Sequence, residues 1–295
     1  MFSRPILAIA AFVLAAAVAP AATPRVFEDS TLYEGKRFSD EIAGQGPDLI
    51  FISGMSSSRE TWAEVARQLR SRYRVHLIQL AGYAGEPARD NASGLVIIPS
   101  SKEIAAYLEA QKLTPATVIG HSLGGTVALI LTEAYQQDIK KVMLVDTLPY
   151  WGILYGGPAA TPKTLYKVAE AARRAPTKTP MSDRVRKRMA VSPENQKKIE
   201  EWVEATNDSA AINSWADDIT IDLRPGLKTI HVPVTLVYPD YAPIGEDKAA
   251  IVARYTGEFA DLKGIKFVQI HDSVHFVMFD QPEQFMQALE DFLKE

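Results

Sequence analysis

Residues 116–125 of the chain read ATVIGHSLGG, and this stretch decides the fold. A short apolar run typical of a buried strand leads into GHSLG, and apolar residues at helical spacing follow. In this context the pattern G-x-S-x-G indicates a sharp strand-to-helix turn that exposes the serine hydroxyl. Small residues at Gly120 and Gly124 let the backbones approach closely. The stretch predicts Ser122 as a nucleophile at a sheet edge; the simpler alternative is a serine that only caps a glycine-rich helix start.

Short apolar runs and helical patterns alternate on both sides of this turn, which is typical of a mainly parallel sheet flanked by helices. The runs are near-continuous, as expected for strands buried on both faces. The expected strands are Asp48–Ile52, Arg74–Leu80, Ala116–Ile119, Lys141–Val145, Val234–Tyr238 and Ile265–Ile270. The expected helices include Glu60–Leu69, Lys102–Gln111, Thr126–Gln136 and Pro282–Leu293. The predicted fold class is therefore α/β.

Residues 148–227 break this alternation, because they are helix-rich and separate two strands of the same sheet. We interpret them as an inserted helical cap on a core made of residues 22–147 and 228–295. The insertion carries a basic run, Arg184-Val185-Arg186-Lys187-Arg188. A solvated helix face is the preferred interpretation of this run, and a patch that steers anionic substrates is the alternative.

A serine hydroxyl needs a base that takes its proton and an acid that orients that base. The loop after the last strand offers His275, preferred over His271, which abuts the strand. For the acid, Asp240 directly follows one strand and Asp146 directly follows another. Both aspartates fit the chain order Ser, Asp, His, and the proline-containing turn after Asp240 favours Asp240.

Together these features resemble the α/β-hydrolase superfamily, in its smaller, capped, esterase-like branch. The segments that carry the resemblance are Gly44-Gln45-Gly46-Pro47, Ser53-Gly54-Met55, Gly82-Tyr83-Ala84-Gly85, the turn at Ser122, Tyr238-Pro239-Asp240, Val274-His275-Phe276 and Gln281-Pro282. The resemblance implies Ser122 as nucleophile, His275 as base and Asp240 as acid. It also implies an oxyanion hole formed by the backbone N–H groups of Met55 and Leu123.

The chain departs from the family pattern at two places. Ser53-Gly54 stands where the family usually has His-Gly, which changes what supports the oxyanion loop. An aspartate and a closing serine are common around the turn at residues 82–85, where this chain has Gln79, Ala81 and Glu86. These departures bear on the subfamily and the substrate more than on catalysis.

The implied reaction is acyl transfer through an acyl-enzyme, with a small-molecule ester as the expected substrate and with no metal or organic cofactor. Three aromatic residues that lead into the cap, Tyr150, Trp151 and Tyr155, are candidates for lining the substrate pocket; packing between cap and core is the alternative. A perhydrolase or cofactor-free haloperoxidase could use the same triad. A non-catalytic binding protein is a third possibility, but such a protein would normally have lost a triad residue.

The composition and the N-terminal sequence limit the partners and the cellular location that we expect for this protein. A net charge of −4 argues against nucleic acid as a partner, and the absence of cysteine excludes disulfides and thiolate nucleophiles. Residues 1–21 have the pattern of a signal peptide, with Arg4, an apolar run too short to span a membrane, and small residues before a cleavage site after Ala21. We therefore expect a periplasmic or secreted protein without stable membrane insertion.

Overall fold

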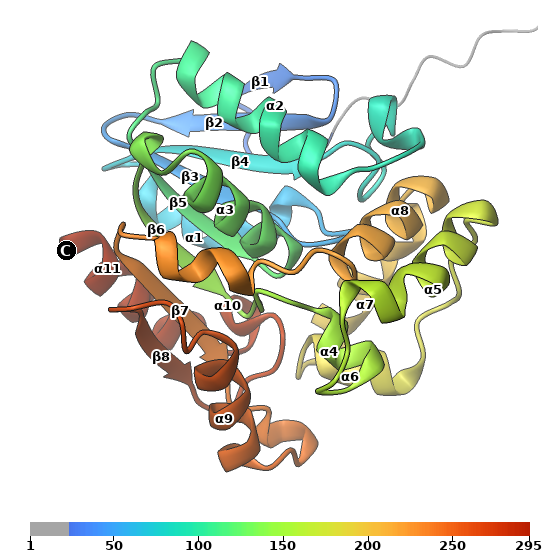
Figure 1. Cartoon of the computed structure of the whole chain (residues 1–295). Coiled ribbons are helices and arrows are strands. Elements are labelled where there is room, and N and C mark those ends of the chain that lie inside the picture. The colour runs from blue at the N-terminus through green and yellow to red at the C-terminus, as the bar shows by residue number, and fades with distance from the viewer. Residues whose placement is uncertain (1–23) are drawn as a thin grey trace, which may run out of the picture.

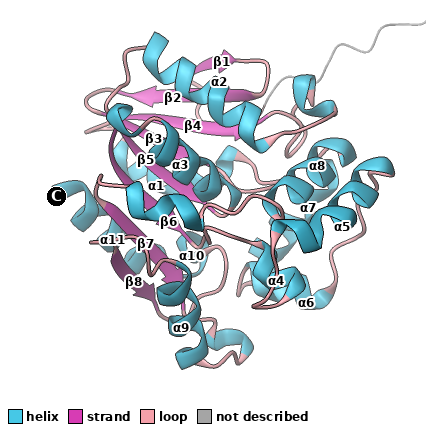
Figure 2. Ribbon diagram, viewed as in Figure 1, coloured by secondary structure: helices cyan, strands magenta, loops and turns pink. Residues whose placement is uncertain are grey.

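The computed structural model describes residues 24–295, which form one mainly parallel sheet with helices on both faces (Figures 1 and 2). The strands are β1 (Thr31–Glu34), β2 (Phe38–Gly44), β3 (Asp48–Ile52), β4 (Arg74–Leu80), β5 (Ala116–His121), β6 (Ile139–Val145), β7 (Val234–Pro239) and β8 (Lys266–Ile270). Their order in the sheet is β1-β2-β4-β3-β5-β6-β7-β8. β2 is antiparallel to both β1 and β4, and the pairs from β4 to β8 are parallel. The predicted fold class is confirmed.

The six predicted strands correspond to β3–β8, whereas β1 and β2 escaped the sequence analysis. β2 reads FSDEIAG, and its polar residues conceal a buried strand. The Asp40 carboxylate on β2 is buried, and it accepts a hydrogen bond from the Tyr107 hydroxyl at 2.7 Å and lies 2.7 Å from Nδ1 of His76. Because a buried carboxylate is tolerated only with such partners, the apolar pattern alone could not identify this strand.

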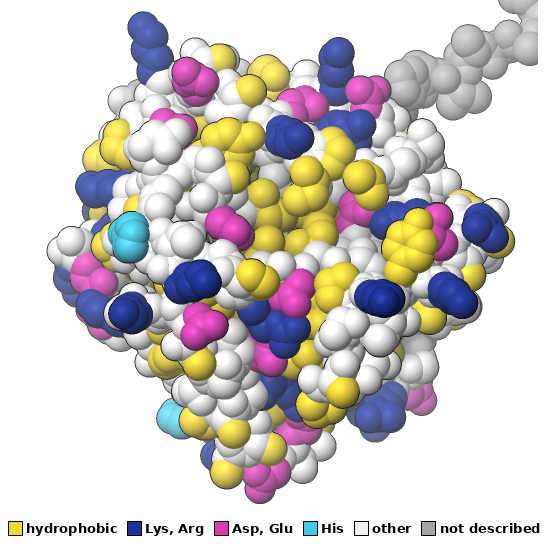
Figure 3. Space-filling model, in the orientation of Figure 1, with side chains coloured by type: hydrophobic (Ala, Val, Ile, Leu, Met, Phe, Trp, Pro, Cys, Tyr) yellow, Lys and Arg dark blue, Asp and Glu magenta, His cyan; other side chains and the backbone are white. Residues whose placement is uncertain are grey.

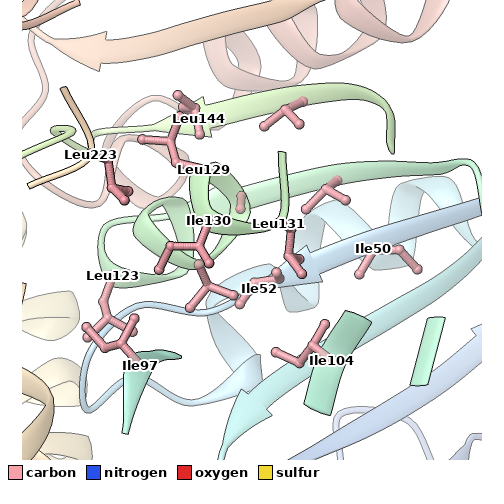
Figure 4. Close-up of a cluster of buried hydrophobic side chains, with 14 of the residues drawn as sticks. Ile50, Ile52, Ile97, Ile104, Leu123, Leu129, Ile130, Leu131, Leu144 and Leu223 are labelled. Atoms are coloured by element: carbon pink, nitrogen blue, oxygen red, sulfur yellow. The ribbon is translucent and has the colours of Figure 1, made fainter. Parts of the chain in front are cut away.

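Helices cover the two faces of the sheet and bury one apolar cluster on each. The helices α2 (Ile97–Ala110), α3 (Leu123–Ala134) and α9 (Lys248–Glu258) pack on one face, and α1 (Ala63–Leu69), α10 (Val277–Asp280) and α11 (Pro282–Lys294) pack on the other. Alternation along β3 sends Ile50 and Ile52 to the first cluster and Leu49 and Phe51 to the second. Figure 4 shows the first cluster between α2, α3 and the strands. This layering fixes the strand ends on which the candidate site is built.

Five helices lie between β6 and β7 in the chain, and we call them the inserted helices. They are α4 (Gly152–Gly156), α5 (Pro162–Arg174), α6 (Asp183–Met189), α7 (Pro193–Ala205) and α8 (Asp208–Asp218). The last four each begin at a Ser, Thr or Asn whose side chain accepts a hydrogen bond from a backbone N–H of the first turn. In Figure 1 the group lies beside the carboxyl ends of the strands.

The predicted signal peptide, residues 1–21, lies outside the described residues. Among residues 24–295, no helix combines the length and the hydropathy that crossing a membrane requires.

Candidate active site

Ser122 occupies the sharp turn between β5 and α3. Its backbone has a positive φ of 54° with ψ −124°, and its N–H donates to the carbonyl of Val145 at 2.9 Å. The neighbouring positions must be glycine because there is no space for a side chain. A Cβ on Gly120 would lie 2.3 Å from the carbonyl oxygen of Gly124, and a Cβ on Gly124 would lie 2.2 Å from that of Ile52. The turn is therefore strained at its serine, as at other functional turns of this kind.

The loop after β3 packs directly against this serine. A Cβ on Gly54 would lie 3.0 Å from Cβ of Ser122 and 3.1 Å from Nδ1 of His121. The loop thereby brings the backbone next to Ser122, and Met55 is its next residue. Leu123 is the first residue of α3, so its N–H has no partner within the helix. Of the two predicted oxyanion donors, Leu123 thus directly follows the serine in the chain, and Met55 follows the glycine that packs against it.

A buried ionic network holds the far end of this loop. The Arg59 side chain, fully buried, donates to the carboxylate of Glu86 and to the hydroxyl of Ser39, and the Arg59 N–H donates to Oε1 of Gln79 at 2.8 Å. Burial, the largest influence, raises the pKa of Glu86, and the charge of Arg59 opposes that rise. Gln79 and Glu86 are two of the positions where the chain departs from the family pattern. The residues at these two positions therefore support the loop after β3.

His275 lies in the loop after β8 and is mostly buried. Its Nδ1 lies 2.6 Å from Oδ2 of Asp146, the residue that directly follows β6. Asp146 is itself in the left-handed region, with φ 43°, and its N–H donates to the carbonyl of Val237 at 2.8 Å. The residue that orients the histidine is therefore Asp146, which the sequence analysis kept as the alternative.

Two tyrosines complete the surroundings of Asp146. Tyr241 donates its hydroxyl to Oδ2 at 2.8 Å, and Tyr255 of α9 donates to Oδ1. Burial alone would raise the pKa of Asp146, but the charge of His275 and the hydrogen bonds from His275 and both tyrosines outweigh it and lower the pKa. The carboxylate is thus held ionised next to the imidazole.

The prediction that Asp240 orients the histidine is wrong. Its Oδ1 accepts from the N–H of Ala242 at 3.0 Å, and its Oδ2 lies 3.3 Å from Nζ of Lys248 and 3.5 Å from Nδ1 of His271. The Asp240 carboxylate therefore folds back on its own turn. The next residue, Tyr241, is the one that reaches the site, because its positive φ of 51° redirects the chain. His271, the other histidine considered, is exposed beside Asp240.

His121, the residue before Ser122, supports the backbone of His275. Its buried ring lies with Nε2 3.1 Å from the His275 carbonyl oxygen, and the ring centroids of the two histidines are 4.6 Å apart. Burial, followed by the charge of His275, lowers the pKa of His121 to about 3. His121 is therefore neutral, with Nε2 as its donor, at any pH where the site operates.

The three aromatic residues predicted to line a pocket have different surroundings. Only Trp151 contacts the site, with its ring edge-on to His275 at a centroid distance of 6.3 Å. Tyr150 is fully buried, lies under the guanidinium of Arg224 and belongs to an apolar cluster formed by residues of the insertion, so it packs within the insertion. Tyr155 is 56% exposed and meets Trp215 edge-on.

A polar chain that the sequence analysis missed runs from Trp151 into the inserted helices. The indole N–H donates to Oγ1 of Thr126 at 3.2 Å, and Thr126 donates to Oδ1 of Asp218 on α8 at 3.0 Å. Burial raises the pKa of Asp218 to about 8; the hydrogen bond from Thr126 opposes the rise and Asp217 adds to it. A neutral carboxyl on α8 therefore contacts Thr126, which lies one turn along α3 from Ser122.

The insertion also holds the backbone of the histidine loop. The N–H of His275 donates to the carbonyl of Arg188 at 3.1 Å, and that of Phe276 donates to Met189 at 2.9 Å. Asp280 bridges the two segments, because its carboxylate accepts from Val191 at 2.8 Å and from Val274 at 2.9 Å.

In the described part of the chain no three histidine or carboxylate side chains gather in a way that could hold a metal ion. What the arrangement offers chemically is an imidazole oriented by a carboxylate, at the same sheet edge as a strained, glycine-flanked serine.

Apolar side chains gather near the middle of the face in Figure 3, where α2, α3 and the inserted helices meet, and charged side chains surround them. This face offers an apolar surface of the kind that small organic ligands contact.

Comparison with curated proteins gives partial matches. The chain is similar to the pimeloyl-[acyl-carrier protein] methyl ester esterase of Aeromonas salmonicida, with 32% identity over 127 residues, which is 43% of this chain and 48% of that protein. The chain thus matches about half the length of this relative. The substrate in its name is that of the relative, and the partial match does not assign it to this chain.

Comparison with solved structures shows the fold. The enol-lactonase from Burkholderia xenovorans LB400 superposes with a TM-score of 0.71 at 19% identity, covering 88% of this chain and 96% of that one. The bromoperoxidase from Bacillus anthracis superposes with a TM-score of 0.70 at 17% identity, covering 90% and 100%. At such identities the likeness concerns the fold alone.

A family model described as "Alpha/beta hydrolase family" matches residues 49–288, which is most of the chain and spans Ser122, Asp146 and His275. The match, the sheet order and the turn at Ser122 agree, and this chain belongs to the alpha/beta hydrolase family.

Proposed function

We propose that this protein is a serine hydrolase that cleaves carboxylic esters, with Ser122 as nucleophile, His275 as base and Asp146 as the acid that orients the base. The observation that carries the proposal is the 2.6 Å contact between His275 and Asp146, in a fold that presents Ser122 on a strained turn at the same sheet edge. The esterase function of the partial curated relatives supports the ester class.

The proposed reaction begins when Nε2 of His275 takes the proton of the Ser122 hydroxyl as the oxygen attacks the ester carbonyl. Asp146 stabilises the imidazolium that forms, and it holds the proton-bearing Nδ1 in place. The backbone N–H groups of Met55 and Leu123 donate to the oxyanion. His275 then protonates the leaving alcohol, and water attacks the acyl-enzyme in the same way to release the acid.

The decisive experiment combines labelling and turnover on the purified protein. A fluorophosphonate probe should label Ser122, located by peptide mass spectrometry, and p-nitrophenyl esters of increasing chain length should be hydrolysed with one preferred length. Hydrogen peroxide with bromide, assayed in parallel, tests the perhydrolase or haloperoxidase alternative. The absence of both labelling and turnover would reject both enzyme functions.

We also propose that the protein is exported after cleavage behind Ala21, on the basis of the sequence pattern of residues 1–21 alone. N-terminal sequencing of the protein recovered from a periplasmic extract or culture medium of an expressing bacterium should start at Ala22. A start at Met1 in the cytoplasmic fraction alone contradicts export.

A further inference from the structure

A pocket of about 610 Å³ lies between α6 and the turn after β7, at the seam of the insertion and the core. Its lining is unusually basic. The lining residues are Arg184, Lys187, Arg188, Pro243, Ile244 and Glu246. Three cations therefore face one carboxylate in this pocket.

The one carboxylate in the lining is already neutralised. Glu246 forms an ion pair with Arg188, and its second oxygen lies 3.8 Å from Nη1 of Arg254. An incoming anion therefore meets little repulsion from Glu246, because two guanidinium groups share that carboxylate.

The other two cations are available. Arg184 and Lys187 are exposed, and within residues 24–295 neither forms a salt bridge. They are three residues apart on α6, a spacing that places side chains on one helix face, and both line the pocket. A solvated basic helix face would explain their exposure, but it does not explain why both residues line the same pocket.

The pocket is also rigid on its inner side. The guanidinium of Arg188 lies 4.8 Å from the ring centroid of Tyr241, and Tyr241 donates to Asp146. The carbonyl of Arg188 accepts from the N–H of His275. Arg188 therefore lines the pocket and, together with Tyr241, supports the Asp146–His275 pair.

We propose that this pocket binds an anionic oxygen group, a carboxylate or a phosphate, held by Arg184 and Lys187 beside the fixed Arg188. Guanidinium and ammonium donors are the groups that proteins use for such anions, and Pro243 and Ile244 add an apolar wall for the organic part of a ligand. The anion is either a free small molecule or the remote end of an ester substrate.

Titration of the purified protein with inorganic phosphate, by calorimetry at constant ionic strength, tests the site without requiring turnover. The double variant Arg184→Ala/Lys187→Ala should weaken phosphate binding by about tenfold or more. The matched control is Lys163→Ala/Lys167→Ala on α5, which removes the same charge from exposed positions of the same insertion and should leave binding unchanged. Absence of saturable binding, or equal weakening in both variants, overturns the proposal.

Ester kinetics then identify the source of the anion, and this step alone rests on the proposed function. The ratio of kcat/KM for an ester with a terminal carboxylate to that for its neutral analogue is measured in wild type and in the Arg184/Lys187 variant. A fall of about tenfold in this ratio assigns the pocket to the substrate. An unchanged ratio, with phosphate binding lost, assigns it to a free anion. If no ester is cleaved at all, the proposed function fails while the calorimetric result stands.

Discussion

Nδ1 of His275 lies 2.6 Å from Asp146 and is separated from Asp240, whose carboxylate caps its own turn. Asp146→Asn should therefore lower kcat by orders of magnitude, on the order of 10⁴ by analogy with serine proteases, because the amide stabilises the wrong histidine tautomer. Asp240→Asn is the matched control and should keep kcat within about tenfold. Steady-state kinetics on both variants measure the two losses of kcat. A larger loss in Asp240→Asn than in Asp146→Asn would identify Asp240 as the acid that orients the histidine.

Ser122→Ala should abolish ester hydrolysis and fluorophosphonate labelling while the melting temperature changes little. The hydroxyl is a small group, and in the described residues it takes no part in a side-chain hydrogen bond that the fold would lose. Differential scanning calorimetry together with turnover separates chemistry from folding. Activity near that of wild type would show that Ser122 is not the nucleophile.

Glu86→Gln should leave the guanidinium of Arg59 buried without its counter-charge and lower the free energy of unfolding by about 3–5 kcal/mol. It should also lower kcat more than it raises KM, because the network holds the loop that carries Met55 and not the substrate. Glu64→Gln, in an exposed ion pair with Arg67, is the control and should change neither quantity measurably. A stability loss with unchanged kcat would make the network structural only.

The raised pKa of Asp218, about 8, predicts a pH dependence of stability. In the folded state Asp218 keeps its proton up to about pH 8, whereas in the unfolded state it loses that proton near pH 4. Its contribution is therefore complete below about pH 4 and is lost as the pH rises towards 8, by up to about 1.4 kcal/mol per pH unit.

Urea unfolding at several pH values between 4 and 8 measures this slope. Asp218→Asn stays neutral, so its stability relative to wild type should increase as the pH rises. Asp261→Asn, at an exposed position, should keep the wild-type slope. Parallel curves for wild type and Asp218→Asn would mean that Asp218 is ionised in the folded protein.

The sequence predicted those parts of the fold that depend on local pattern. The six apolar strands, the turn at Ser122 and the position of His275 at the sheet edge all follow from periodicity and from glycine spacing. β2 was missed because its buried carboxylates are satisfied by distant partners such as Tyr107, 67 residues away from Asp40. No local pattern records such a contact.

The choice of the acid shows the same limit. Asp146 and Asp240 both follow strands that end at one sheet edge, so chain order could not separate them. The difference lies in Tyr255, which donates to Asp146 from 109 residues away, and in the backbone of Tyr241, which turns the chain towards the site. A contact across that separation depends on the folded helix α9, which the sequence analysis did not identify.

The backbone pairing of Arg188 and Met189 with His275 and Phe276 bears on how this protein can diversify. Grafting a foreign insertion between β6 and β7 would replace Trp151, which contacts His275, but it would also remove two carbonyl acceptors and the Asp280 bridge from the histidine loop. A chimera intended to change specificity must therefore retain residues 188–191. Evolution of this insertion is subject to the same constraint at this short inner segment.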